Sequence, residues 1–240
     1  MSPKKVDKKK LLKEPDEFIS TTMRAMLWLK RNSRLVASAA LTAVVMGVAI
    51  WGWGVYQNRR EAQAQELFSQ AYKIYSRALE ASEESTSRDL MNQAAERFSG
   101  TMKEFPGTRA AWMARLYRGR ADYSLGRYEE AIKEFRGALD SVPKGDDGTL
   151  KGLSLQGLAQ AYVAKGECDK AVELLRELRT QAGGAFGTMA DWELGKCYEA
   201  QGKIQEAISL YQALSAVVGQ PLQREMIQAK LNGLKKGEGQ

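Results

Sequence analysis

Few side chains in this chain could perform covalent chemistry. Its 240 residues include no histidine, which removes the commonest general base and the nucleophile systems that depend on an imidazole. The two cysteines, Cys168 and Cys197, are too few to build a zinc site from thiolates alone. Paired carboxylates such as Glu129 and Glu130 fall on helix faces that we expect to be solvated. The sequence therefore predicts a protein that is not an enzyme and that uses neither a metal nor another cofactor.

Motifs for nucleotide and phosphate binding are also missing from the sequence. A glycine-rich stretch occupies 183–188, but it has neither the lysine nor the preceding strand pattern of a phosphate-binding loop. We interpret this stretch as a linker in which Thr188 caps the start of the following helix. The chain also lacks the nucleophile elbow and the dinucleotide fingerprint. A small-molecule substrate is thus disfavoured.

The net charge of +7 is concentrated at the start of the chain. Residues 1–34 carry ten Lys or Arg against four acidic residues, a net charge of +6, so the remainder of the chain is nearly neutral. A nucleic-acid-binding domain would instead carry a basic patch on its folded surface. Nucleic acid is therefore not an expected partner. We interpret 1–34 as a basic tail in which 16–31 could form a short amphipathic helix.

A segment without any charged residue follows this tail, over 35–58. Its apolar part, 35–56, would be about 33 Å long as a helix, which matches the roughly 30 Å thickness of the hydrocarbon core of a bilayer. Trp51, Trp53 and Tyr56 gather at its far end, where aromatic side chains favour the lipid headgroups. The segment is therefore predicted to be a single transmembrane helix.

The basic residues also predict the orientation of this helix. Ten Lys or Arg precede it, whereas only Arg59 and Arg60 follow it directly. The positive-inside tendency then places the N-terminus in the cytoplasm and the rest of the chain across the membrane. Two alternatives are a buried helix of a soluble protein and a cleaved signal peptide, because Ala62-Gln63-Ala64 resembles a cleavage site. The length of the apolar run favours the membrane anchor.

Beyond this segment, one pattern recurs three times. Each copy has a helix, a turn glycine and a second helix with an alanine five residues after the glycine. The glycine and alanine pairs are Gly126 with Ala131, Gly166 with Ala171, and Gly202 with Ala207. The glycines lie 40 and 36 residues apart, which a unit of about 34 residues with short insertions explains. A glycine suits such a turn because it adopts a left-handed backbone conformation at little cost.

At these positions the chain resembles the tetratricopeptide repeat family. The resemblance implies an all-α fold in which paired helices stack into a solenoid. In each first helix a small residue, Gly119, Ala159 or Gly195, is expected to lie opposite the alanine of the second helix. A less regular unit precedes the three copies: 61–79 would supply its first helix, and a polar loop at 82–87 would replace its turn glycine.

These segments predict the organisation of the whole chain. It comprises a basic cytoplasmic tail (1–34), a transmembrane helix (35–58), a helical linker with the degenerate first repeat (59–108), three tetratricopeptide-like repeats (109–220), and a C-terminal capping helix with its tail (221–240). The predicted fold class is all-α, with a single N-terminal transmembrane helix followed by a solenoid of helical hairpins.

The resemblance also implies where partner proteins would bind. The first helices of stacked hairpins line the concave surface of such a solenoid. By the usual phase of the family, this surface would display Met113, Leu116, Arg120, Tyr123, Leu153, Gln156, Gln160, Val163, Met189, Trp192, Lys196 and Glu199. Aromatic, Met and Leu side chains mixed with single charges suit the capture of a peptide or a helix. The alternative is that several of them pack against the terminal helices of the chain itself.

The two cysteines fall on neighbouring helices of this arrangement. Cys168 would open the second helix of one repeat, and Cys197 would lie late in the first helix of the next. In an oxidising compartment they could form a disulfide if their Cα atoms come within about 7 Å of each other. The alternative is a pair of small buried apolar side chains.

The combination of a lysine-rich tail, one span and divergent repeats resembles a narrower family. Residues 14–19 and the stretch 225–234 are similar to the corresponding parts of the YfgM-like ancillary subunits of the SecYEG translocon in the bacterial inner membrane. That resemblance implies a periplasmic repeat domain that helps to hand secreted chains over. Its partners would be translocon subunits, a periplasmic chaperone or the emerging polypeptide. The alternative is a scaffold subunit of an envelope or outer-membrane assembly complex.

Overall fold

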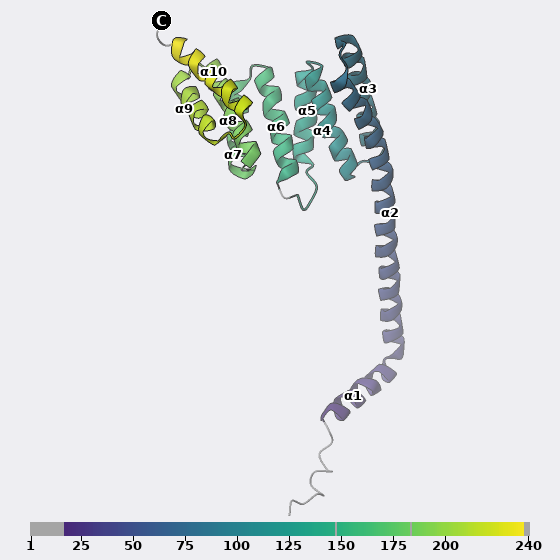
Figure 1. Ribbon diagram of the computed structural model, residues 1–240. Helices are drawn as coiled ribbons and strands as arrows, with labels where there is room; N and C mark the ends of the chain where they lie inside the picture. Colours follow the sequence, from purple (N-terminus) through teal and green to yellow (C-terminus); the bar gives the residue numbers. More distant parts are fainter. Residues whose placement is uncertain (1–16, 147, 183, 238–240) are drawn as a thin grey trace, which may run out of the picture. The chain divides into compact units, whose positions relative to one another are not determined.

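The computed structural model describes residues 17–146, 148–182 and 184–237, and helices contain most of them. The helices are α1 (Glu17–Arg31), α2 (Ser33–Glu80), α3 (Glu84–Glu104), α4 (Arg109–Ser124), α5 (Tyr128–Asp140), α6 (Thr149–Ala164), α7 (Cys168–Ala182), α8 (Gly184–Ala200), α9 (Ile204–Val217) and α10 (Pro221–Gly237). No strand occurs within these described ranges. The predicted all-α fold class is confirmed (Figure 1).

The chain forms two compact units, residues 1–58 and 59–240, and α2 runs through the boundary between them. In the first unit, α1 ends at Arg31 and the Asn32 side chain donates a hydrogen bond to the Trp28 carbonyl at 3.0 Å. The most apolar window of α2 has a mean hydropathy of 2.0 and is not buried by any part of the described chain. Among the described residues, α2 is the one helix that is long and apolar enough to cross a membrane.

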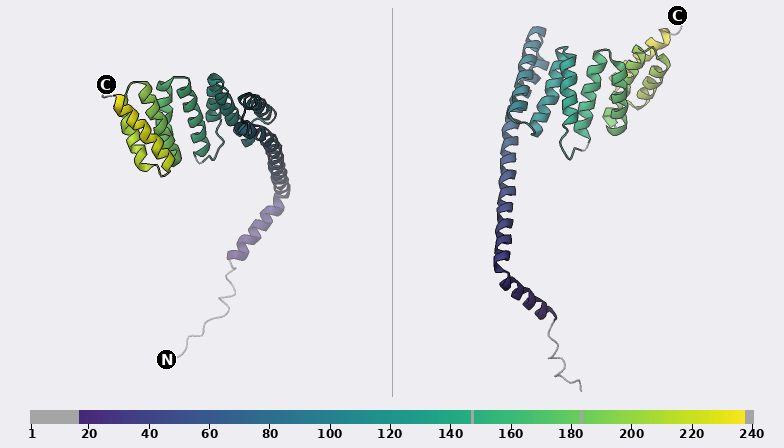
Figure 2. Two further views of the ribbon diagram at one scale, coloured as in Figure 1. Left: turned by 45° about the horizontal axis from the view of Figure 1, so that its top comes forward. Right: turned by 180° about the vertical axis from the view of Figure 1, so that it is seen from behind.

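In the second unit, α3 to α10 lie side by side in the order of the chain (Figures 1 and 2). Three of its hairpins close with the same turn, at Gly126, Gly166 and Gly202, whose φ angles are 75°, 82° and 72°. After each glycine the next amide donates to a carbonyl five residues earlier, as Arg127 N does to Asp122 O at 2.8 Å. This pattern satisfies the free carbonyls at the end of a helix and reverses the chain.

The first hairpin, between the end of α2 and α3, closes without a glycine. The Ser87 hydroxyl donates to the Ala78 carbonyl at 2.7 Å and so joins the two helices. Because α3 already begins at Glu84, the loop is shorter than the one expected over 82–87. An aromatic cluster holds this hairpin to α4: the Phe68 ring lies 5.8 Å from Phe98 and 5.7 Å from Tyr117, between centroids.

The glycine-rich stretch is not the linker that the sequence suggested. Helix α8 begins at Gly184, so Thr188 lies inside the helix and does not cap it; residue 183 is outside the described residues. Phe186 and Met189 pack against the main core, and this packing outweighs the weak helix propensity of glycine. The start of α6 has the cap that the sequence analysis missed: the Asp146 carboxylate accepts from the amides of Leu150 and Lys151, at 3.0 Å each.

The last helix covers the end of the stack. Ile227 and Leu231 of α10 are each 4% exposed and share a core with Tyr211 and Leu214 of α9. Residues on the opposite side of α10, such as Glu225 and Ala229, are exposed. The apolar face of α9 is thereby buried.

Candidate functional site

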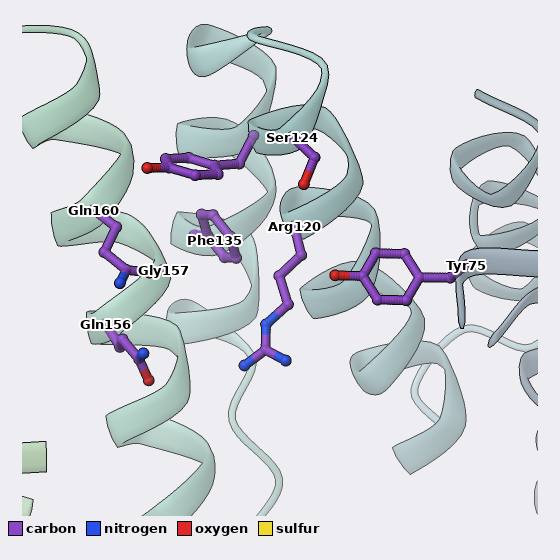
Figure 3. Close-up of a pocket in the computed structure, with 8 residues that line it drawn as sticks. Tyr75, Arg120, Ser124, Phe135, Gln156, Gly157 and Gln160 are labelled. Carbon is purple, nitrogen blue, oxygen red and sulfur yellow. The ribbon is translucent and has the colours of Figure 1, made fainter. Parts of the chain in front are cut away.

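A cavity of about 260 Å³ opens between the first helices of two neighbouring repeats, α4 and α6, and we call it the central cavity (Figure 3). It is lined by Tyr75, Arg120, Tyr123, Ser124, Phe135, Gln156, Gly157 and Gln160. Four of these, Arg120, Tyr123, Gln156 and Gln160, are among the twelve residues predicted for the concave surface. The structure therefore brings one-third of the predicted set into a single site.

Arg120 is the charged group of the central cavity. Figure 3 shows its side chain between Tyr75 on one side and the α6 residue Gln156 on the other. Its guanidinium carbon lies 5.0 Å from the centroid of the Tyr117 ring, a cation–π arrangement that holds the side chain in place. In the described part of the chain, no carboxylate forms an ion pair with Arg120. The guanidinium can therefore donate hydrogen bonds to a carboxylate or a carbonyl of a bound molecule.

Tyr75 of α2 lines the cavity, and Tyr117 of α4 packs against it. Burial raises the pKa of Tyr75 and of Tyr117, and the charge of Arg120 acts in the opposite direction. Both phenols are therefore neutral at physiological pH and can donate a hydrogen bond as well as accept one. The Tyr117 ring lies 5.4 Å from that of Tyr75, edge to face. Sequence reasoning missed Tyr75, because it belongs to the irregular hairpin and reaches the cavity only through tertiary packing.

The opposite wall carries two carboxamides, those of Gln156 and Gln160 on α6 (Figure 3). Both residues are half-buried, and neither carboxamide is hydrogen-bonded to another of the described residues. A carboxamide offers a donor and an acceptor side by side, which matches the paired groups of a peptide bond. Arg120, the two tyrosines and these carboxamides together suit an extended polypeptide better than a purely apolar ligand.

Phe135 of α5 lines the cavity, and its ring packs between α4 and α6. Its ring lies so close to Gly157 that a Cβ built there would be 2.4 Å from it, and a Cβ at Gly119 would be 2.9 Å from it. The small residue of α4 therefore makes its closest approach to Phe135, and not to Ala131 as the sequence suggested. The same holds at Gly195, where a Cβ would be 2.6 Å from the Tyr211 ring.

Some residues predicted for the concave surface lie in the core instead. Leu116 is 1% exposed and cannot contact a partner, which corrects that prediction. Met113, Leu153 and Val163 are half-buried against the main core. Their apolar character serves the packing of neighbouring hairpins.

The residues predicted from the third repeat make contacts within the chain. Met189 and Trp192 line a second cavity of about 670 Å³, the C-terminal groove, together with residues of α9 and α10. Lys196 forms an ion pair with Glu193 at 2.8 Å. Glu199 accepts a hydrogen bond from the Tyr211 hydroxyl at 2.6 Å and pairs with Lys230 of α10 at 2.8 Å. The alternative that the terminal helix fills part of the predicted surface thus applies to this repeat.

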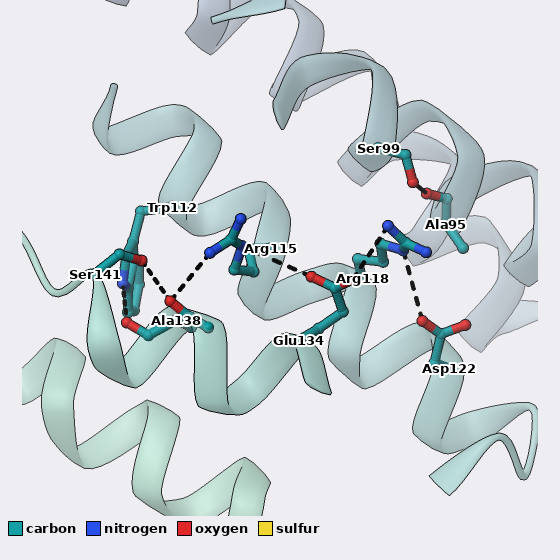
Figure 4. Close-up of polar contacts among 10 residues, drawn as sticks. Ala95, Ser99, Trp112, Arg115, Arg118, Asp122, Glu134, Ala138 and Ser141 are labelled. Carbon is teal, nitrogen blue, oxygen red and sulfur yellow. Dashed lines mark hydrogen bonds and ion pairs between the residues drawn. The ribbon is translucent and has the colours of Figure 1, made fainter. Parts of the chain in front are cut away.

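A network of ion pairs accounts for the charged residues Arg115, Arg118 and Asp122 of α4 (Figure 4). Glu134 of α5 pairs with Arg115 at 3.7 Å and with Arg118 at 3.2 Å. Asp122 pairs in turn with Arg118 at 3.7 Å, one helical turn earlier, and with Arg127 at 3.6 Å. These contacts compensate for charge that is withdrawn from water between the two helices.

Asp122 is the weak point of this network. It is 3% exposed, and its Oδ2 has no hydrogen-bond donor among the described residues. Burial raises the pKa of its carboxyl, against the opposing charges of Arg118 and Arg127. The folded chain therefore binds a proton on Asp122 at a higher pH than the unfolded chain does. The free energy of unfolding therefore falls as the pH rises from the pKa that the Asp122 carboxyl has in the unfolded chain through the higher pKa that it has in the folded chain.

We expect Asp122→Asn to raise the thermal midpoint at pH 7 by a small amount, within about 3 °C. The substitution removes a buried charge. Arg118 remains paired with Glu134, and Arg127 still donates a hydrogen bond to the side-chain oxygen Oδ1 of Asn92. Melting of both proteins by circular dichroism between about pH 4 and pH 7 would measure the difference, which should shrink as the pH falls. A lower midpoint for the variant at pH 7 would show that the ion pairs outweigh the cost of burial.

No group of His, Cys, Asp or Glu side chains suited to a metal ion occurs among the described residues. A family model described as a tetratricopeptide repeat-like domain matches residues 27–236. A curated relative, the ancillary SecYEG translocon subunit of Neisseria gonorrhoeae (strain ATCC 700825 / FA 1090), is 27% identical over 193 residues, which cover 80% of this chain and 86% of that one.

Solved structures show the same fold. Two crystal structures of nearly identical TPR-like repeats, from a kinesin light chain-type protein of Podosopora anserina, match with a TM-score of 0.54 each. Their sequence identities are 20% and 19%, and the match covers 75% of this chain and 88% of each of those chains. At this identity the likeness concerns the fold alone.

Proposed function

Because the chain belongs to the tetratricopeptide repeat-like family, as its repeats predicted, we propose that residues 59–240 bind segments of other proteins and catalyse no reaction. The observation that carries this proposal is the central cavity. Arg120, Gln156 and Gln160 present hydrogen-bonding groups to this cavity. Among the described residues, no carboxylate forms an ion pair with Arg120, and no residue is hydrogen-bonded to the carboxamide of Gln156 or Gln160. Tyr75 and Tyr123, which also line the cavity, supply aromatic surface beside them. An extended polypeptide offers the carbonyls, amides and side chains that these groups require.

The apolar part of α2 is proposed to anchor this domain in the inner membrane of a bacterium. Trp51 and Trp53 are 72% and 64% exposed, an arrangement that costs little when the surroundings are lipid headgroups. The ten basic residues before the apolar segment support a cytoplasmic N-terminus and a periplasmic repeat domain. Protease added to spheroplasts should then digest the repeats, and their protection would overturn this orientation.

The partner is proposed to be the protein-translocation machinery. The likeness to the Neisseria protein, which is named for an ancillary role at the SecYEG translocon, extends over most of both chains. A periplasmic repeat domain held beside a translocon would meet emerging polypeptides while they are still extended. The central cavity would hold such a segment briefly and release it to a periplasmic chaperone.

A photo-crosslinking residue in place of Ser124, which lines the central cavity, tests this function in cells. Adducts with translocon subunits or with secreted chains would support the proposal. The control position is Lys133, an exposed residue of α5 that does not line the cavity. Equal adducts from both positions would contradict a role for the cavity. Adducts with the subunits of an envelope assembly complex alone would favour the scaffold function instead.

Arg120→Ala is expected to lower the yield of the Ser124 adducts by about tenfold or more, because a hydrogen bond to a charged group contributes roughly 1.5–3 kcal/mol. Lys133→Ala removes the same charge from an exposed site and should leave the yield unchanged. The thermal midpoints of both variants should stay near that of the unmodified protein. An unchanged yield from the Arg120 variant would show that the guanidinium does not contact the bound chain.

A further inference from the structure

The two cysteines of the chain meet between α7 and α8. Cys168 is 8% exposed and Cys197 is fully buried, and both belong to the main core. The two residues are 29 positions apart in the sequence, but α7 and α8 pack against each other and Cys168 is one of the groups next to the Cys197 thiol. Neighbouring thiols on packed helices can be joined when their sulfur atoms approach to the separation of a disulfide, which is about 2 Å.

We propose that Cys168 and Cys197 form an intramolecular disulfide that joins α7 to α8 when the repeat domain folds in an oxidising compartment. The location of the domain in such a compartment rests on the orientation proposed above. The bond itself rests on the burial of both cysteines in one core between two helices that pack against each other. In the structure both cysteines are free, so either can take part in a disulfide.

The reaction requires an oxidant, which would be the disulfide of a thiol oxidoreductase or oxidised glutathione. The Cys168 thiolate attacks one sulfur of that disulfide, a mixed disulfide forms, and the other sulfur leaves as a thiolate. The Cys197 thiolate then attacks the Cys168 sulfur and releases the second thiolate. The pair loses two protons and two electrons in total, and the oxidant becomes a dithiol or two thiols.

The position of each thiol indicates the order of these steps. Cys168 is the first residue of α7, directly after the turn at Gly166, so local opening of that turn exposes it to an oxidant. Cys197 lies inside α8 and is not accessible. Burial raises the pKa of Cys197 well above its usual value, with Cys168 and Glu193 adding to the shift and Lys196 opposing it. Oxidation is therefore faster during folding than after it.

The bond would stabilise the repeat domain against unfolding. It closes a loop of 30 residues, from Cys168 to Cys197, and so restricts the unfolded chain. For a domain of this size, the thermal midpoint of the oxidised protein should exceed that of the reduced protein by about 5–10 °C.

The test uses the full chain, purified in detergent and equilibrated in a buffer of reduced and oxidised glutathione. Thiols are counted after acid quenching and denaturation, and the intact mass is measured. We expect both thiols to disappear together, with the loss of two hydrogen atoms and no glutathione attached. Two persistent thiols, or a glutathione adduct on either cysteine, would overturn the proposal.

Two controls make the result specific. Cys168→Ser and Cys197→Ser should each leave one thiol that cannot be lost within the chain, and the midpoints of these variants should not depend on the redox buffer. A second arm traps thiols by alkylation in intact cells before purification. If the pair oxidises in glutathione but is found reduced in cells, the proposed orientation fails while the disulfide pairing stands.

Discussion

Two arginines introduced into the apolar part of α2, as Val44→Arg with Val48→Arg, are expected to release the protein from the membrane. Both valines lie near the middle of that segment and are about three-fifths exposed, at 61% and 62%. An arginine at the centre of a spanning helix disfavours insertion by roughly 2.5–3.5 kcal/mol, so two lower the equilibrium for insertion by about 10⁴-fold. The variant should therefore be lost from the membrane pellet after extraction at alkaline pH.

The matched control replaces the same valines by leucine. Leucine is at least as apolar as valine and favours a helix, so this variant should remain in the pellet like the unmodified protein. If the arginine variant also resists extraction, then lipid does not surround this segment of α2. The membrane anchor would then have to be abandoned, whereas the helical repeats would be unaffected.

Phe135→Ala is expected to cause the largest loss of stability in the repeat domain, about 3–5 kcal/mol. The ring is 2% exposed and fills the space above both Gly119 and Gly157. Since neither glycine has a side chain that could move into the vacated volume, the cavity would remain open. For a domain of this size the thermal midpoint should fall by about 10 °C or more, measured by circular dichroism.

Two glycine substitutions provide a control for this interpretation. Gly157→Ala adds a methyl group that meets the Phe135 ring at 2.4 Å, and overpacking of this kind costs about 1–3 kcal/mol. Gly100→Ala in α3 is the same change at a position with no atom within 4 Å of the added carbon. It should stabilise the protein by about 0.5–1 kcal/mol, because alanine favours a helix over glycine. If both variants were equally stable, Phe135 would not fit tightly between the helices.

The elements that could be predicted from the sequence are those with a local cause. The turns at Gly126, Gly166 and Gly202 were found because a helix that ends in a left-handed residue strongly favours glycine at that point. The long apolar segment of α2 was found from its composition alone. The start of α8 was missed, because Phe186 and Met189 keep a glycine-rich stretch helical through contacts that are distant in sequence.

The candidate site was predicted in part, and for a related reason. The phase of the repeat places Arg120 and Tyr123 toward the central cavity, and Gln156 and Gln160 opposite them. The same phase wrongly placed Leu116 on the concave surface. A helix that packs against two neighbours buries part of the face that the repeat pattern assigns to that surface. Single-sequence patterns cannot show which edge of such a stripe is covered, since that depends on the angle between helices.

The position of α10 has a consequence for how such an array can lengthen or self-associate. The surface of α9 that would otherwise receive another hairpin is occupied by Ile227 and Leu231. On the face of α10 opposite Ile227 and Leu231, helical spacing places Glu225 and Asn232, which are exposed and polar. Copies of the protein are thus discouraged from polymerising end to end through this helix. A duplicated hairpin would be accommodated ahead of α10, where neighbouring helices bury apolar side chains against each other, and not after it.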